Sequence, residues 1–244
     1  MQHSSPFSLP PYTHTSAQQT VANTLCPALP AMYAHWARRS QRLLVLNAGL
    51  GFHLQCLWEA GFDVTAHATT SQDLVLAKSI LGTRADYMLS QSEFLMCDDQ
   101  HFDYALYLGP LETHDMASIR KQIREIHRVT ASGLIVVFVN IFSLHALGQG
   151  IRKLQKKTLY ATGYPPRNPL FMRYILKKEF PTASFHWFFT PIIPRLFSHN
   201  GRYHQRVNRL MRWSPLSALY GVRIDFTPQP GCTGLVLQTE NIHA

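Results

Sequence analysis

Residues 42–51 read RLLVLNAGLG and join an apolar run to a glycine-rich segment. Residues 42–47 form a short continuous apolar run, which is typical of a strand buried on both faces of a parallel sheet. The glycine-rich residues 48–51 follow directly, so we expect the strand to turn through a loop into a helix. In open parallel sheets such a loop is a common ligand-binding place, although a plain tight turn has the same pattern.

Segments with strand and helix character alternate after this loop. Strand-like runs cover 62–68, 86–89, 102–108 and 133–140, and helical periodicity covers 52–60, 71–81 and 116–129. Such alternation specifies a parallel sheet with helices on both faces, because each crossover helix packs back onto the sheet in the right-handed sense. The sequence therefore predicts a doubly wound α/β fold. Further helices are expected near 144–159 and 170–180, and further strands over 186–190 and 233–239.

The segments outside the alternating region are assigned by composition. We expect residues 1–41 to form an N-terminal helical cap, because apolar side chains recur there at loosely helical spacing between prolines. Residues 42–244 are expected to form one α/β domain. Within it, residues 191–230 are interpreted as a basic aromatic insertion between the last two strands. Its arginines are Arg195, Arg202, Arg206, Arg209, Arg212 and Arg223.

The composition is globular, but the charge is unevenly distributed. Of 244 residues, 46% are apolar and 15% are charged, which excludes a disordered or fibrous chain. Residues 151–224 contain 14 of the 23 lysines and arginines and a single acid, Glu179. A basic surface of this kind attracts the phosphates of nucleic acids, lipids or small substrates, or simply keeps a protein soluble. Both interpretations stay open.

Cysteine and histidine spacing does not indicate a metal site. The four cysteines form no Cys-x-x-Cys pair, and the thirteen histidines form no His-x-x-x-His pair. The most apolar window, 133–148, is interrupted by polar residues and is shorter than the ~20 residues of a membrane span. Residues 1–30 also lack the pattern of a secretory signal. We expect a reduced, cytoplasmic protein with no metal.

Four segments follow one another in a specific order along the chain. They read LLVLNAGLG (43–51), EAGFDVTAHATTSQDLVLAK (59–78), FDYALYLGPLETH (102–114) and IREIHRVTASGLIVVFV (123–139). Together they resemble the successive motifs of class I S-adenosylmethionine-dependent methyltransferases of the small-molecule (type 11-like) branch. The resemblance covers about residues 42–140. It implies a Rossmann-like, mostly parallel seven-stranded sheet with helices on both faces and an antiparallel last strand.

The resemblance also implies where S-adenosylmethionine binds. In this family the loop after the first strand holds the methionine part, and residues after the second and third strands hold the ribose and the adenine. Asn47, Ala68 and Gln91 stand where the family has acids, so the cofactor acids are degenerate, and the hydroxyl of Thr69 or Thr70 is a neutral substitute for the ribose contact. The cofactor-binding residues implied are Asn47, Ala48, Gly49, Leu50, Gly51, Ala68, Thr69, Gln91, Ser92 and Leu108.

Residues 109–114 resemble the family's loop after the fourth strand, which faces both the cofactor and the acceptor. Glu112 and His114 are therefore the expected catalytic residues, acting as acid or base. The alternative for Glu112 is that it caps or braces the next helix. Methyl transfer from a sulfonium needs little beyond alignment and deprotonation of the acceptor, so the absence of a catalytic dyad does not count against it.

Two functions are consistent with these residues. The first is methyl transfer from S-adenosylmethionine to an oxygen, nitrogen or carbon of a small-molecule acceptor. The second is a catalytically inactive binding module that acts through its basic C-terminal face on a membrane surface or a protein partner. A nicotinamide oxidoreductase is less consistent, because Leu54 replaces the third glycine of the dinucleotide fingerprint. No Asp/Asn-Pro-Pro-Tyr/Phe sequence follows 102–108, which argues against nucleic-acid bases as acceptors.

Overall fold

The computed structural model describes residues 25–47, 51–91, 93–108, 116–140, 168–190 and 219–226. Its centre is a seven-stranded sheet with the order β3-β2-β1-β4-β5-β7-β6. The strands are β1 (Arg42–Leu46), β2 (Asp63–Ala68), β3 (Asp86–Leu89), β4 (Phe102–Leu108), β5 (Thr130–Val139), β6 (Ser184–Thr190) and β7 (Leu219–Asp225). Strands β1 to β5 run parallel, and β7 is antiparallel to both β5 and β6. The predicted fold class is confirmed.

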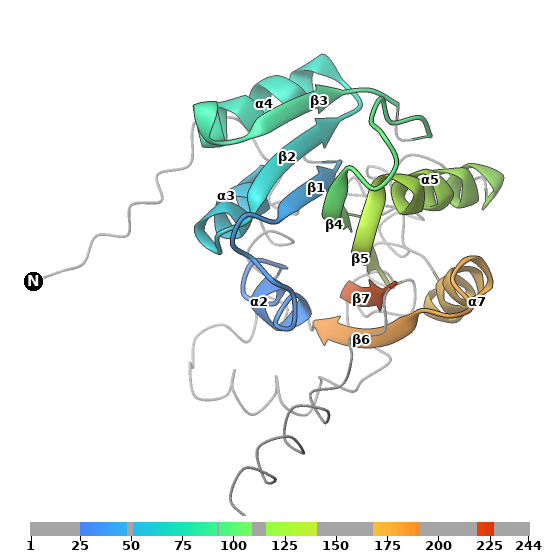
Figure 1. Ribbon diagram of the computed structural model, residues 1–244. Helices are drawn as coiled ribbons and strands as arrows, with labels where there is room; N and C mark the ends of the chain where they lie inside the picture. The colour runs from blue at the N-terminus through green and yellow to red at the C-terminus, as the bar shows by residue number, and fades with distance from the viewer. Residues whose placement is uncertain are drawn as a thin grey trace, which may run out of the picture.

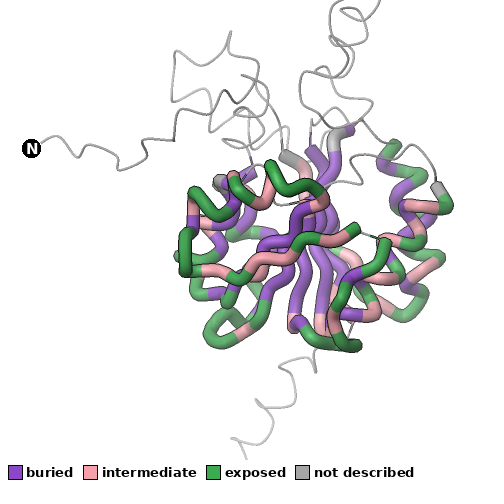
Figure 2. Tube along the Cα trace, turned by 90° about the horizontal axis from the view of Figure 1, so that it is seen from above, coloured by how far each residue is buried: buried purple, intermediate pink, exposed green. Residues whose placement is uncertain are grey.

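Helices cover both faces of this sheet (Figure 1). On one face lie α2 (Leu29–Met32), α3 (Phe52–Glu59) and α4 (Ser71–Leu81), and on the other lie α5 (Met116–Val129) and α7 (Pro169–Glu179). A short 3-10 turn, η2 (Gly82–Arg84), follows α4. Figure 2 shows buried residues along the strands in the middle and exposed residues on the outer sides of the helices. The core therefore consists of two apolar layers, one on each face of the sheet.

Most of the predicted bounds agree with the structure. The helices α4 and α5 and the strands β3 and β4 begin and end at the predicted residues. Strand β5 begins earlier than predicted, at Thr130, because Thr130 pairs with Phe102 and the carbonyl of Ser132 accepts a hydrogen bond from Phe226 N (2.9 Å). The predicted helix 144–159 and the predicted strand 233–239 lie outside the described residues.

The seventh strand, β7, is not predicted from the sequence, where its residues belong to the segment 191–230 interpreted as an insertion. The structure inserts β7 between β5 and β6 as the antiparallel strand. Its Arg223 is 4% exposed, and Arg223 Nε donates to Asp225 Oδ2 (3.0 Å) while Nη1 donates to the carbonyl of Met32 (3.2 Å). The assignment of Arg223 to a basic surface was therefore wrong, because this guanidinium is buried and paired.

The described part of the N-terminal segment packs against the sheet. Leu25, Leu29 and Trp36 are buried in the apolar layer that also contains α3 and α4. The ring of Trp36 stacks on Tyr104 of β4, with centroids 4.2 Å apart, and Trp36 Nε1 donates to Asp225 Oδ1 (3.0 Å). These contacts attach the segment before β1 to β4 in the middle of the sheet and to β7, which lies next to the edge strand β6.

Candidate functional site

The implied cofactor residues that the structure describes gather at the carboxyl edge of the parallel strands. Asn47 follows β1 and Leu108 ends β4, and these strands are paired in register up to Leu46 and Tyr107. Thr69 follows β2 and Gln91 comes shortly after β3, whose last pair is Ala68 with Leu89. The parallel register thus brings four separate sequence positions to one edge. Six implied site residues lie outside the described residues, namely Ala48, Gly49, Leu50, Ser92, Glu112 and His114.

Both described ends of the loop after β1 have left-handed backbone. Asn47 has φ 57°, a conformation that asparagine tolerates better than most residues, and Gly51 has φ 63°. Gly51 begins α3 and is buried, and a Cβ there would lie 1.9 Å from Cδ1 of Ile80 on α4. Glycine is therefore favoured at residue 51 by the positive φ of the turn, and any larger residue would also have to displace the end of the Ile80 side chain.

The end of β2 offers a hydroxyl and no carboxylate. Ala68 is buried, whereas Thr69 is half-buried at the edge. The hydroxyl of Thr70 is already used as the cap of α4, because it accepts a hydrogen bond from Asp73 N (3.2 Å) and donates to Asp73 Oδ2 (2.7 Å). Thr69, which lies directly after β2 at this edge, stays the candidate substitute for the ribose acid.

A buried histidine joins the end of β2 to the end of β3. His67 is fully buried, and its Nε2 lies 2.9 Å from the carbonyl oxygen and 3.1 Å from the hydroxyl of Ser90. Burial lowers the pKa of His67, so the ring is neutral and its Nε2–H donates to Ser90. The sequence gives no indication of this residue, because a histidine in an apolar strand cannot be recognised as a link between two strands before its hydrogen-bond partner is known.

Gln91 lies in an exposed turn beside an acid that is already bonded. The carbonyl of Gln91 accepts a hydrogen bond from Phe94 N (3.0 Å), and the side chain of Gln91 is exposed. Glu93 accepts a hydrogen bond from the hydroxyl of Ser118 near the start of α5. This carboxylate is thereby directed to α5, so it does not replace the missing acids.

Metal chemistry and membrane insertion find no support in the described residues. No group of three or more His, Cys, Asp or Glu side chains is arranged to bind a metal ion within the ranges given above. In the same part of the chain, no helix has the length and apolar character needed to span a bilayer.

Comparison with known proteins gives similar structures and no similar sequences. Neither a protein-family model nor a curated protein matches the chain. A possible histamine N-methyltransferase from Thermotoga maritima is similar with a TM-score of 0.62 at 15% identity, covering 86% of this chain and 92% of that one. Magnesium protoporphyrin IX methyltransferase from Synechocystis, with bound S-adenosylhomocysteine, has a TM-score of 0.61 at 13% identity, covering 86% and 85%.

A third similar structure is a [4+2]-cyclase, SpnF, with a TM-score of 0.58 at 15% identity and coverage of 88% of this chain and 84% of that one. Identities this low establish the fold and leave the reaction open. The strand order, the antiparallel β7 and the helices on both faces agree with these neighbours. The chain therefore has the Rossmann-like fold of the class I S-adenosylmethionine-dependent methyltransferases.

Proposed function

We propose that the protein transfers a methyl group from S-adenosylmethionine to a small-molecule acceptor. The observation that carries this proposal is the carboxyl edge of the sheet, where the turn from β1 into α3 lies beside polar side chains after β2 and β3. Nucleotides bind at this edge in open α/β sheets. The methyltransferases among the similar structures support the same reaction class.

The side chains at this edge fit the cofactor as a neutral set of hydrogen-bonding groups. The amides of Asn47 and Gln91 and the hydroxyl of Thr69 each offer a donor and an acceptor. The N-cap residue of α3 is Gly51, and no side-chain cap is found there among the residues that the structure describes; a helix N-terminus favours a carboxylate such as that of the methionine part. A protein carboxylate that accepts hydrogen bonds from the ribose hydroxyls contributes roughly 1.5–3 kcal/mol to binding. Without it we expect this chain to bind the cofactor about ten- to a hundredfold more weakly than a protein that has the acid.

Bound S-adenosylmethionine supplies an electrophilic methyl group on a sulfonium sulfur. The chain has to align the acceptor atom with this methyl group and take up the proton that the acceptor loses. Glu112 and His114 are the residues we propose for the proton, on the family resemblance of residues 109–114. We further propose that the reaction takes place in the cytoplasm.

The lost acids favour a second candidate function, a methyltransferase-fold module that no longer catalyses. Such a module would act through its basic C-terminal segment on a membrane surface or a protein partner. Arg223 makes no contribution to that surface, because it is buried against Asp225 and Met32. The two candidates differ in one property, the ability to bind the cofactor.

Thermal unfolding with S-adenosylmethionine or S-adenosylhomocysteine separates the two candidates, with NADH and adenosine as controls. A ligand at 100 times its Kd adds about 2.7 kcal/mol, and each kcal/mol raises the midpoint by roughly 2–4 °C for a chain of this size. We expect a saturable rise of several degrees with the two sulfur nucleotides alone. Gln91→Ala should reduce it, whereas Gln41→Ala, just before β1 at the opposite edge, should not. No rise at millimolar ligand would refute the enzymatic proposal.

A further inference from the structure

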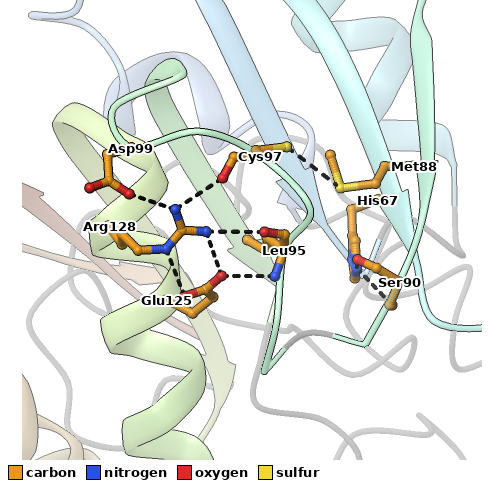
Figure 3. A network of polar contacts seen from close by, with 8 residues as sticks. All are labelled: His67, Met88, Ser90, Leu95, Cys97, Asp99, Glu125 and Arg128. Atoms are coloured by element: carbon orange, nitrogen blue, oxygen red, sulfur yellow. Dashed lines mark hydrogen bonds and ion pairs between the residues drawn. The ribbon is translucent and has the colours of Figure 1, made fainter.

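The loop after β3 is held at both ends by side chains of neighbouring elements (Figure 3). At its start, Ser90 binds the ring of His67, and Ser90 N donates to the carbonyl of Ala68 (3.3 Å). At its far end, the backbone near Leu95 is bound by side chains of α5. Gln91, the expected adenine contact, lies between these two attachment points.

Glu125 and Arg128 together bind both backbone polar groups of Leu95. Leu95 N donates to Glu125 Oε1 (2.8 Å), and Arg128 Nη2 donates to the carbonyl of Leu95 (3.0 Å). The two side chains also bind each other, through Nε to Oε2 (3.0 Å) and Nη2 to Oε1 (2.7 Å). Arg128 Nη1 donates in addition to the carbonyl of Cys97 (2.9 Å) and to Asp99 Oδ1 (2.6 Å). One arginine thus bonds three residues of the loop.

The attachment is partly shielded from water. The side chain of Glu125 is 13% exposed and that of Arg128 is 34% exposed, while the Leu95 side chain is buried in the apolar layer under α5. The hydrogen bonds from Arg128 lower the pKa of Glu125, which keeps it ionised at neutral pH. Charge-assisted hydrogen bonds are stronger than neutral ones, and shielding strengthens them further. Leu95 is therefore a well-defined fixed point of the loop.

The turn between the two fixed points carries both polar and apolar side chains toward solvent. Gln91 is exposed, and Phe94, whose N–H closes the turn onto Gln91, is 64% exposed. Leu89 and Met96 on either side are exposed as well. A few polar groups among apolar side chains are characteristic of small-molecule binding surfaces. The position of this turn depends on how firmly Leu95 is held.

We propose that Glu125 and Arg128 are positioning residues that place Gln91 against the adenine of the bound cofactor and so set the preference for adenine. The inference rests on the proposed function, since it presupposes that the cofactor binds. In this proposal both side chains act through the backbone of Leu95 and not through the cofactor itself. Sequence reasoning gives only a weak indication of the pair, namely a glutamate and an arginine three positions apart on a predicted helix.

The test compares two ligands that differ only in the base. Isothermal titration calorimetry measures the Kd of S-adenosylhomocysteine and of its 6-unsubstituted purine analogue, whose base has a hydrogen where adenine has its amino group and so offers neither end of the Gln91 amide a partner there. For the natural chain we expect a clear preference for the adenine ligand. Arg128→Ala should weaken the binding of S-adenosylhomocysteine by up to about tenfold, the contribution of one neutral hydrogen bond between Gln91 and the base, and leave the purine analogue nearly unchanged. The ratio of the two Kd values then falls toward one. A general loss of stability does not produce this effect, because it weakens the binding of both ligands alike.

Three further variants serve as controls. Arg124→Ala removes another α5 arginine, which is 67% exposed and pairs with Glu179 of α7 (2.7 Å), and it should leave both affinities unchanged. Glu125→Gln keeps an oxygen that accepts from Leu95 N and should have a smaller effect than Glu125→Ala. Gln91→Ala should abolish the adenine preference by itself, and Arg128→Ala should then add little in the double variant. If Arg128→Ala does not fold, the Glu125 variants supply the comparison.

Hydrogen exchange gives a readout without ligand. Peptides covering 91–99 should lose protection in Arg128→Ala and keep it in Arg124→Ala. Unchanged Kd values and an unchanged base preference in a folded Arg128→Ala, with S-adenosylhomocysteine still bound by the natural chain, would overturn the inference and leave the proposed function standing. Failure of the natural chain to bind S-adenosylhomocysteine would instead overturn the proposed function, and this inference with it.

Discussion

Gly51→Ala is expected to destabilise the protein for two separable reasons. The backbone of residue 51 has φ 63° and ψ −33°, a combination that L-residues adopt only under strain of about 1–3 kcal/mol. The new Cβ would also lie 1.9 Å from Cδ1 of Ile80, the far end of a half-buried side chain that can shift, so we expect a further cost of about 1 kcal/mol, the low end for overpacking. We expect the free energy of unfolding to fall by roughly 2–4 kcal/mol in total. Urea unfolding followed by circular dichroism measures this change.

Two comparison variants separate the strain from the steric clash. Gly82 also has a positive φ (57°), with a different ψ of −121°, and nothing lies within 4 Å of an added Cβ, so Gly82→Ala reports the strain of a positive φ without a steric clash. Ile80→Val removes the clashing methyl group at a cost of about 0.5–1.5 kcal/mol. In the double variant Gly51→Ala/Ile80→Val we expect about 1 kcal/mol more stability than the sum of the single costs predicts. Strict additivity in the double variant would refute the packing argument.

Three other predictions concern buried charges and thiols. Burial lowers the pKa of His53 from 6.5 to about 3, so between these pH values the folded state binds fewer protons than the unfolded state. The free energy of unfolding should therefore fall as the pH drops below 6.5, by roughly 2 kcal/mol at pH 5. Urea unfolding at each pH measures this fall, which should be smaller in His53→Leu. Asp225→Ala leaves the buried Arg223 without its carboxylate and should cost about 3–5 kcal/mol in the same assay, and a loss under 1 kcal/mol would contradict this pairing. A hydrogen bond from Cys26 lowers the pKa of Cys56 to about 7, so iodoacetamide labelling of Cys56 should rise through pH 7, and Cys26→Ala should move this rise to higher pH.

The carboxyl edge of the sheet was predictable in part. The loop after β1 and the residues after β2 and β3 could be placed at one edge because neighbouring strands were expected to be parallel, and the parallel register agrees; that Asn47, Thr69 and Gln91 bind the cofactor stays a prediction. The attachment of Leu95 by Glu125 and Arg128 could not be identified in the same way. These residues are distant in the sequence, and only the packing of α5 against the sheet makes their hydrogen bonds possible.

The alternating strands and helices from β1 to α5 follow from local signals, namely hydrophobic periodicity and the glycines between the elements. The same local reasoning failed for β7, since Arg223 in a basic aromatic segment indicates a polar surface. That these residues form a strand depends on tertiary contacts, because a buried arginine is stable only where partners are present. Asp225, two residues further along β7, supplies one of these partners. The carbonyl of Met32 supplies the other, and it comes from a distant segment that reaches Arg223 only once the sheet has assembled.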